Sequence, residues 1–448
     1  MSSRALLALG LSFSLLSAKA QTAPTHEAIG PLHPATFVTK GWAQTNGGAG
    51  GRIVRVTTLA SDGPGSLKAA LDTAGPRTIV FEVGGVIDLQ GKSWPLREGR
   101  VTIAGQTAPD PGITLIKGEL VVFARDVIIQ HLSIRPGAYG RAKRSGNDHD
   151  GLSTATGSAR VIVDHCSFSW ATDENLSTSG KRFEGATPDD WREATSHAVT
   201  YSHNLIYEGL GEAVHIKGEH SKGSLIHDNV TQLLLLGNVY ASNRERNALF
   251  KGGAWGAMVN NLIYNPGTKA VHYNLIAHEW VGRPYQVGKV TLVGNAYRAG
   301  PGTEKKVPLF SLGGVGDVEL FLADNLAVDR FGQPLPMTGR YTTSPAQIVS
   351  VREPYLPAGL KWLTPQELER VLPLFVGSRP WARDPLDFKQ LSDIAEDRGQ
   401  LINDELDNNP AGHPQRKPTQ RPFVEADWNL QDMSPKAGWA SLFTQVSK

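Results

Sequence analysis

The stretch Val161–Ser177, which reads VIVDHCSFSWATDENLS, decides the fold. Its first half alternates with the period of a β-strand, so one face is expected to carry Val161, Val163 and His165 and the other Ile162, Asp164 and Cys166. Its second half is polar and holds two adjacent acids, Asp173 and Glu174. A strand that ends in acids beside a groove is typical of an active site. We expect repeats of this strand to build a parallel β-helix.

The same strand pattern recurs along the chain, in segments that begin at Val127, Val161, Val199, Leu233, Gly256, Val290 and Leu320. Apolar residues dominate the first and third positions, and the sixth is asparagine in the last five segments: Asn204, Asn238, Asn261, Asn295 and Asn325. The spacing varies, as expected of coils of one size that carry loops of different length. In a parallel stack these asparagine amides would hydrogen-bond along the stack. The alternative is a chance pattern in another all-β fold.

We expect three parts in the chain. Residues 1–20 contain Arg4, an apolar run and a small-x-small end, which indicates a secretory signal and an extracellular or periplasmic protein. Residues 21–342 form the predicted β-helix. Residues 343–448 form a C-terminal extension with short helices packed on the β-helix, since Thr364-Pro-Gln-Glu367 and Asp384-Pro385 are helix starts.

Composition sets few limits on partners. The 448 residues include 45 basic and 43 acidic side chains, and removal of the predicted signal leaves a formally neutral chain. Attraction for a polyanion must therefore come from local clusters such as Arg141, Lys143 and Arg144. The single cysteine, Cys166, excludes an internal disulfide. No later stretch is apolar for long enough to span a membrane, and we expect a monomer that binds neither membrane nor nucleic acid.

Two groups of acids fall at matching ends of neighbouring predicted coils. Asp148 and Asp150 precede the expected strand 151–155, and Asp173 and Glu174 follow shortly after Ser169. Clustered carboxylates indicate a hard cation such as Ca²⁺, which takes six to eight oxygen ligands. Any one of these acids alone is more often a solvated loop residue or a helix cap.

Basic residues follow on the next coils. The run Asn243–Asn247 holds Arg244 and Arg246, and Lys251 comes shortly after it. A preceding coil carries a group of three further residues: His215, Lys217 and His220. Arg244 with Glu245 is also typical of a surface ion pair. The chain lacks a complete G-x-S-x-G motif, which argues against a nucleophile-elbow hydrolase.

Several stretches together resemble polysaccharide lyase family 1, the pectate lyases, from about residue 45 to about residue 330. They are Gly63-Pro-Gly-Ser-Leu67, Arg77-Thr-Ile-Val-Phe81 with Gly84-Gly-Val-Ile-Asp88, Val101-Thr-Ile-Ala-Gly-Gln106, Val163-Asp-His-Cys-Ser-Phe-Ser169 and Asn243-Arg-Glu-Arg-Asn247. The resemblance implies a right-handed parallel β-helix that cleaves polygalacturonate by β-elimination with Ca²⁺ and gives 4,5-unsaturated products.

The resemblance also implies roles for single residues. Asp150 matches a family calcium ligand and Asp173 a second acid position. The next family acid falls on Ser177, so Glu174 or Asp148 is expected to replace it.

On the basic side, Arg246 matches the arginine that removes the proton. Lys251 takes the place of a substrate-binding arginine, and Lys217 is expected to stand in for the family's substrate-binding lysine. His215 and Arg244 complete the expected substrate-binding set.

Two alternatives stay open. A glycoside hydrolase of the polygalacturonase type would use two of the acids Asp148, Asp150, Asp173 and Glu174 as an acid and base pair. A non-catalytic polysaccharide-binding solenoid would use the same groove without turnover.

Overall fold

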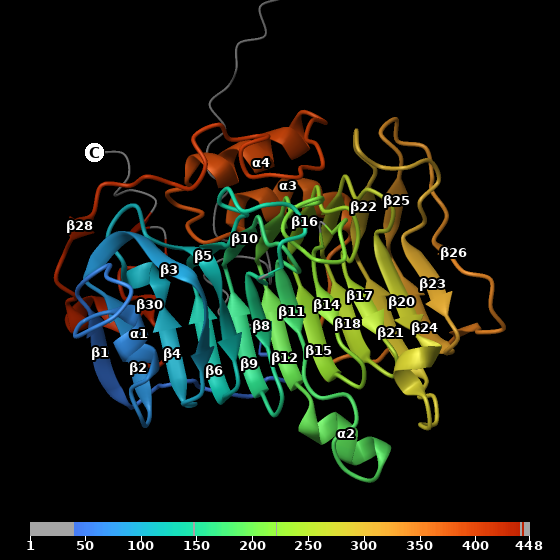
Figure 1. The fold of residues 1–448 in the computed structure, drawn as a ribbon, viewed down its shortest axis with the longest axis horizontal. Helices are drawn as coiled ribbons and strands as arrows, with labels where there is room; N and C mark the ends of the chain where they lie inside the picture. Colours follow the sequence, from blue (N-terminus) through green and yellow to red (C-terminus); the bar gives the residue numbers. More distant parts are fainter. Residues whose placement is uncertain (1–39, 147, 221, 440, 443–448) are drawn as a thin grey trace, which may run out of the picture.

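The strands wind in stacked coils that advance from one end of the molecule to the other (Figure 1). The computed structural model describes residues 40–146, 148–220, 222–439 and 441–442, and the predicted signal at residues 1–20 lies outside them. Each coil adds strands to up to three parallel ladders, one per side of the coil. The predicted all-β, parallel β-helix is thereby confirmed.

Ladder one is a sheet of its own, with the strands β1 (Arg52–Val56), β2 (Arg77–Phe81), β4 (Val101–Ala104), β6 (Arg125–Gln130), β9 (Ala159–Asp164), β12 (His197–Ser202), β15 (Thr231–Leu236), β18 (Trp255–Val259), β21 (Gly288–Val293), β24 (Val318–Ala323) and β27 (Ile348–Ser350).

Ladders two and three share the long strands β3 (Val83–Leu96) and β5 (Ile113–Val122). Ladder two continues through β7 (Leu132–Arg135), β10 (Ser167–Ser169), β13 (Leu205–Tyr207), β16 (Val239–Ala241), β19 (Leu262–Tyr264), β22 (Ala296–Arg298) and β25 (Leu326–Val328). Ladder three continues through β8 (Leu152–Thr154), β11 (Leu176–Thr178), β14 (Leu225–Ile226), β17 (Leu249–Lys251), β20 (Val271–Leu275), β23 (Phe310–Gly314) and β26 (Thr338–Arg340).

The register of ladder one is the one predicted from the repeat. Val161 pairs with Val127 on one side and with Val199 on the other, and the same column continues through Leu233. These four side chains are fully buried in the main core. Stacked aliphatic columns thus fill the inside of the helix, and burial of this kind is the main stabilising term of the fold.

The corner between ladders one and two corrects the predicted alternation. His165 has a left-handed backbone with φ of 51°, so the strand β9 ends at Asp164 and the side-chain order is reversed beyond it. Cys166 therefore joins Val161 and Val163 in the core, and His165 does not. A left-handed residue interrupts the period of two on which the prediction depended.

The asparagine column lies directly after this corner and forms the predicted side-chain ladder. The Asn204 Nδ2 donates to Asn238 Oδ1 at 3.0 Å, and Asn238 Nδ2 donates to Asn261 Oδ1 at 3.0 Å. The same contacts join Asn261 to Asn295 and Asn295 to Asn325. Each Oδ1 also accepts the backbone N–H of the preceding asparagine, which satisfies buried donors at a turn.

The helices of the C-terminal extension lie along the outer face of ladder two (Figure 1), whereas its residues 348–350 form the last strand of ladder one. Its helices α3 (Pro365–Phe375) and α4 (Pro385–Ala395) bury apolar residues such as Leu368 and Leu372 against Leu205 and Val239. Buried Arg135 of β7 anchors α4 through Asp384 at 2.8 Å and Asp387 at 2.9 Å.

Two expectations for these helices fail in detail. By their spacing in the sequence Phe388, Leu391 and Ile394 should share the buried face of α4, but the Phe388 side chain is 64% exposed while the other two are buried. The face turned to the solenoid instead carries Asp387, because Arg135 there needs a charged partner. Thr364 is the N-cap of α3, but its hydroxyl bonds to the Glu367 carboxylate and not to a backbone N–H.

The remaining elements are α1 (Leu67–Leu71), α2 (Pro188–Ala194), the short 3₁₀ turns η3 (Gly105–Thr107), η4 (Ala277–Trp280) and η5 (Glu425–Asp427), and the strands β28 (Thr419–Gln420), β29 (Trp428–Asn429) and β30 (Ser434–Pro435). Ser66 caps α1, and its hydroxyl accepts from the Ala69 N–H at 3.1 Å. Within the part of the chain that the structure describes, no helix has both the length and the apolarity needed to cross a bilayer.

Candidate active site

A polar groove of about 460 Å³ runs along the loops that lead into ladder three. Five of the residues predicted for the site line it: Asp173, Glu174, Lys217, Arg246 and Lys251. They come from successive coils, because each loop between ladders two and three ends at the same edge of the stack. The remaining predicted residues lie on the same or neighbouring loops.

Three predicted acids lie together at one end of this groove. Carboxylate oxygens of Asp150, Asp173 and Glu174 are all within 4.8 Å of one another. The backbone locks two of the loops in place, since Glu174 N–H donates to Asp150 Oδ1 at 3.0 Å and Gly151 N–H donates to the Glu174 carbonyl at 2.9 Å. This set of close oxygens suits a hard cation such as Ca²⁺.

Electrostatics supports the same interpretation. Burial raises the pKa of Asp150 well above its usual range, and repulsion from Asp173 and then Glu119 raises it further. The Ser177 hydroxyl, at the position of the missing acid, acts in the opposite direction by bonding to Asp150. A cation among these carboxylates would offset their mutual repulsion.

Asp148 and two histidines lie beside this cluster. The His215 Nε2 is 3.5 Å from Asp148 and 3.7 Å from Asp173, and the His220 Nε2 is 3.3 Å from Asp173. Burial alone would raise the pKa of Asp173, but the two imidazoles outweigh burial and hold it below its usual range. His215 thus supports an acid of the cluster and does not line the groove, whereas exposed Lys217 does.

Arg246 lines the groove, and its side chain reaches the acid cluster. Its guanidinium forms an ion pair with the Glu174 carboxylate, and its backbone is left-handed with φ of 62°. The Ser224 N–H donates to the Arg246 carbonyl at 2.6 Å, which holds that backbone in place. Burial lowers the pKa of Arg246, although Asp173 and Asp150 raise it in part.

The other two basic candidates have acidic partners. Lys251 contacts Glu279 and lies 3.4 Å from Asp228, and its side chain is 8% exposed. Arg244 pairs with Glu219 on the rim and is 37% exposed. Arg244 therefore matches the ordinary surface pair considered from the sequence, except that its partner is Glu219 and not Glu245.

The groove also contains residues that the sequence did not point to. Glu245 lies between Lys222, with which it pairs, and Lys269, whose Nζ is 2.5 Å away. Glu174, Lys222 and Glu245 are paired in parallel along the stack. Tyr341 reaches the groove from the loop after β26, where Lys269 Nζ lies 5.0 Å from its ring centre. The loops before ladder three differ in length, so no constant spacing in the sequence marks these alternating charges.

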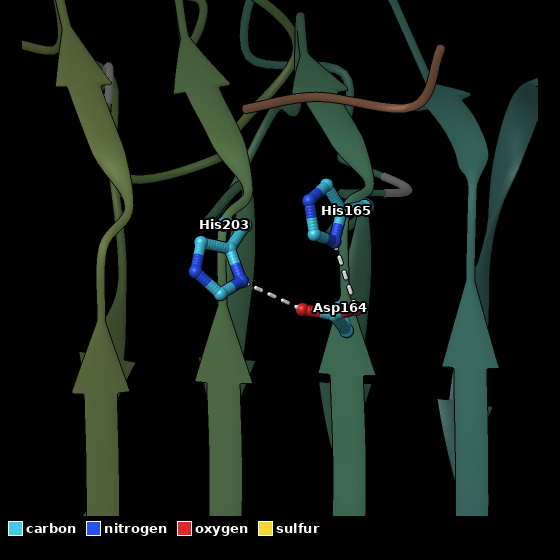
Figure 2. Close-up of side chains that lie close together, drawn as sticks. All are labelled: Asp164, His165 and His203. Atoms are coloured by element: carbon cyan, nitrogen blue, oxygen red, sulfur yellow. Dashed lines mark hydrogen bonds and ion pairs between the residues drawn. The ribbon is translucent and has the colours of Figure 1, made fainter. Parts of the chain in front are cut away.

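The motif Asp164–Ser169, which carries much of the sequence resemblance, lies at a different corner. Figure 2 shows the Asp164 carboxylate between two imidazoles, His165 and His203. Their Nδ1 atoms lie 2.8 and 3.0 Å from it. Burial alone would raise the pKa of Asp164, but the two imidazoles hold it well below its usual range. This corner separates ladders one and two, whereas the groove lies before ladder three.

Comparison with known proteins relates the chain to pectate lyases. A protein named probable pectate lyase C from Aspergillus terreus is 34% identical over 262 residues, which are 58% of this chain and 53% of the relative. The chain thus matches about half the length of this relative. No protein-family model matches the chain.

Solved structures agree on the fold. A thermostable pectate lyase aligns with a TM-score of 0.52 at 13% identity, over 76% of this chain and 98% of that structure. A pectate lyase bound to a hexasaccharide aligns with a TM-score of 0.50 at 12% identity, over 79% and 98%. The resemblance to the pectate lyase family that the sequence motifs indicate is therefore confirmed.

Proposed function

We propose that the protein is a pectate lyase, which cleaves de-esterified polygalacturonate by Ca²⁺-assisted β-elimination and leaves a 4,5-unsaturated uronate end. The observation that carries this proposal is the position of Arg246 against the cluster of Asp150, Asp173 and Glu174 in one groove. The relatives named pectate lyase, and a similar fold with a bound hexasaccharide, support it.

The chemistry needs two kinds of group, and the groove offers both. A bound Ca²⁺ would neutralise the uronate carboxylate and so make the neighbouring C5 proton more acidic. Asp150, Asp173 and Glu174 would hold this ion. Arg246 acts as the base or as the cation that stabilises charge developing on the substrate. Because its pKa is lowered by burial, Arg246 is a better base than an exposed arginine, and activity should be favoured by alkaline pH.

Charged side chains along the groove would position the polyanion. Lys217 is exposed in the groove, and Lys222, Lys251 and Lys269 lie along or beside it. The signal predicted at residues 1–20 would export the enzyme to its polymeric substrate.

The hydrolase alternative fits the acids less well. The two carboxyl groups lie roughly 6.5–9.5 Å apart in an inverting hydrolase and roughly 5–5.5 Å apart in a retaining one. Here the three acids approach within 4.8 Å, which suits a shared cation better. An arginine also binds uronate carboxylates without turnover, so a measurement of activity separates the polysaccharide-binding solenoid from the lyase.

One assay separates the three functions. The protein is incubated with polygalacturonate and Ca²⁺, and the ultraviolet absorbance of the unsaturated product is followed together with new reducing ends. A lyase raises both signals. New reducing ends without unsaturated product would show a hydrolase, and binding without either signal would show a binding protein.

A further inference from the structure

Glu174 faces two competing positive partners. One of its carboxylate oxygens belongs to the cluster with Asp150 and Asp173, which is the candidate cation site. The same carboxylate forms the ion pair with Arg246. Its side chain is only 3% exposed, so water cannot easily replace a partner that leaves.

Among the described residues, Glu174 is the acid with which Arg246 forms an ion pair. The Arg246 Nε is buried and has no hydrogen-bond partner among the described residues. Its backbone is held by the Ser224 N–H, so only its side chain is free to change partner. In the protein without a bound cation, the ion pair with Glu174 therefore orients the Arg246 guanidinium.

We propose that Glu174 couples cation binding to the freedom of Arg246. Without a divalent cation, Glu174 holds the guanidinium in the ion pair. A cation at Asp150 and Asp173 draws Glu174 to itself and releases Arg246 toward the substrate. Glu174 is in this sense a positioning residue for Arg246, and the inference rests on the proposed function.

Thermodynamic linkage gives this coupling a distinctive sign. If Arg246 competes with the cation for Glu174, removal of Arg246 must tighten cation binding. Typical coupling free energies correspond to about 5- to 150-fold in affinity. Simple charge repulsion between Arg246 and the cation would also tighten binding, so a single variant cannot separate the two causes.

A double-mutant cycle separates them. Calorimetry measures the Ca²⁺ dissociation constant, without substrate, of the wild type, Arg246→Gln, Glu174→Gln and the double variant. We expect Arg246→Gln to tighten binding at least about fivefold in the wild-type background and less than about twofold in the Glu174→Gln background. Equal tightening in both backgrounds would mean repulsion only and would overturn the proposal. Lys269→Gln, which removes a nearby charge not paired with Glu174, should have the same effect in both backgrounds.

A second measurement needs no variant. Crystal structures of the wild type with and without Ca²⁺ should show the Glu174–Arg246 pair broken only in the Ca²⁺ form. A pair that persists with Ca²⁺ bound would overturn the coupling while leaving the lyase proposal intact. Conversely, an intact coupling with no unsaturated product from polygalacturonate would overturn the lyase proposal alone.

Discussion

Replacement of Asn238 by alanine tests whether the asparagine ladder stabilises the solenoid. Asn238 is fully buried, and its Oδ1 accepts from the Asn204 N–H at 2.9 Å and from Asn204 Nδ2 at 3.0 Å. Its Nδ2 donates to the Tyr201 carbonyl at 2.9 Å and to Asn261. The substitution leaves both Asn204 donors without this acceptor and removes one donor from the Tyr201 carbonyl.

The expected loss follows from these groups. Each buried polar group left unsatisfied costs about 1–3 kcal/mol. Asn204 Nδ2 keeps the Val163 carbonyl as an acceptor at 3.1 Å, so the Asn204 N–H is the donor left unpaired. We therefore expect Asn238→Ala to lower the free energy of unfolding by about 1–3 kcal/mol. Urea denaturation followed by circular dichroism measures this loss, provided that unfolding is reversible.

Asn325→Ala is the matched control, because Asn325 ends the ladder and is only partly buried. Water can replace its side chain at Asn295, so the loss should be less than half that of Asn238→Ala. Losses of equal size at the two positions, or a loss below about 1 kcal/mol at Asn238, would refute the view that buried donors make the ladder important.

Three further predictions concern the groove and pH. Arg246→Lys should lower kcat on polygalacturonate by about a hundredfold with little change in KM, whereas Arg244→Lys should be mild; near-normal turnover of Arg246→Lys would exclude its catalytic role. Asp150→Ala should weaken Ca²⁺ binding in calorimetry, and excess Ca²⁺ should restore activity in part; full activity after exhaustive chelation would contradict this. Burial lowers the pKa of His131 in the folded protein to about 3, whereas an imidazole in the unfolded chain has a pKa of about 6.5. Between about pH 6.5 and 3, only the unfolded chain therefore binds a proton at His131. Stability falls as pH falls through that window. His131→Gln should reduce this slope by up to about 1.4 kcal/mol per pH unit in denaturation series, and an unchanged slope would show that His131 is not the cause.

Ladder one could be predicted from the sequence because its columns repeat. A parallel stack places like residues above one another, so Val161 and Val199 or Asn204 and Asn238 leave a visible pattern in the chain. The left-handed corner at His165 leaves no such mark, since a histidine there looks like one more strand residue. The reversal that places Cys166 in the core could therefore be found only in three dimensions.

The groove was harder to predict, for a physical reason. Its residues lie on the loops before ladder three, and these loops differ in length from coil to coil. The pairing of Glu174 with Lys222 and of Lys222 with Glu245 thus has no constant spacing in the chain. The acids could still be identified because they come immediately before a strand, as Asp150 does before β8. The partners that set their charge state, such as His220, could not be assigned.

The buried corner around Asp164 explains why the most specific sequence match is not at the groove. Asp164 and its imidazole neighbours are almost completely enclosed, and every polar contact there constrains which side chains fit. At the groove, water and ions can satisfy a charged group, so Ser177 can stand where the family has an acid without loss of the fold. A match at Asp164–Ser169 therefore predicts the solenoid more securely than the reaction, and the proposed reaction would depend on Arg246 and the acids that it faces.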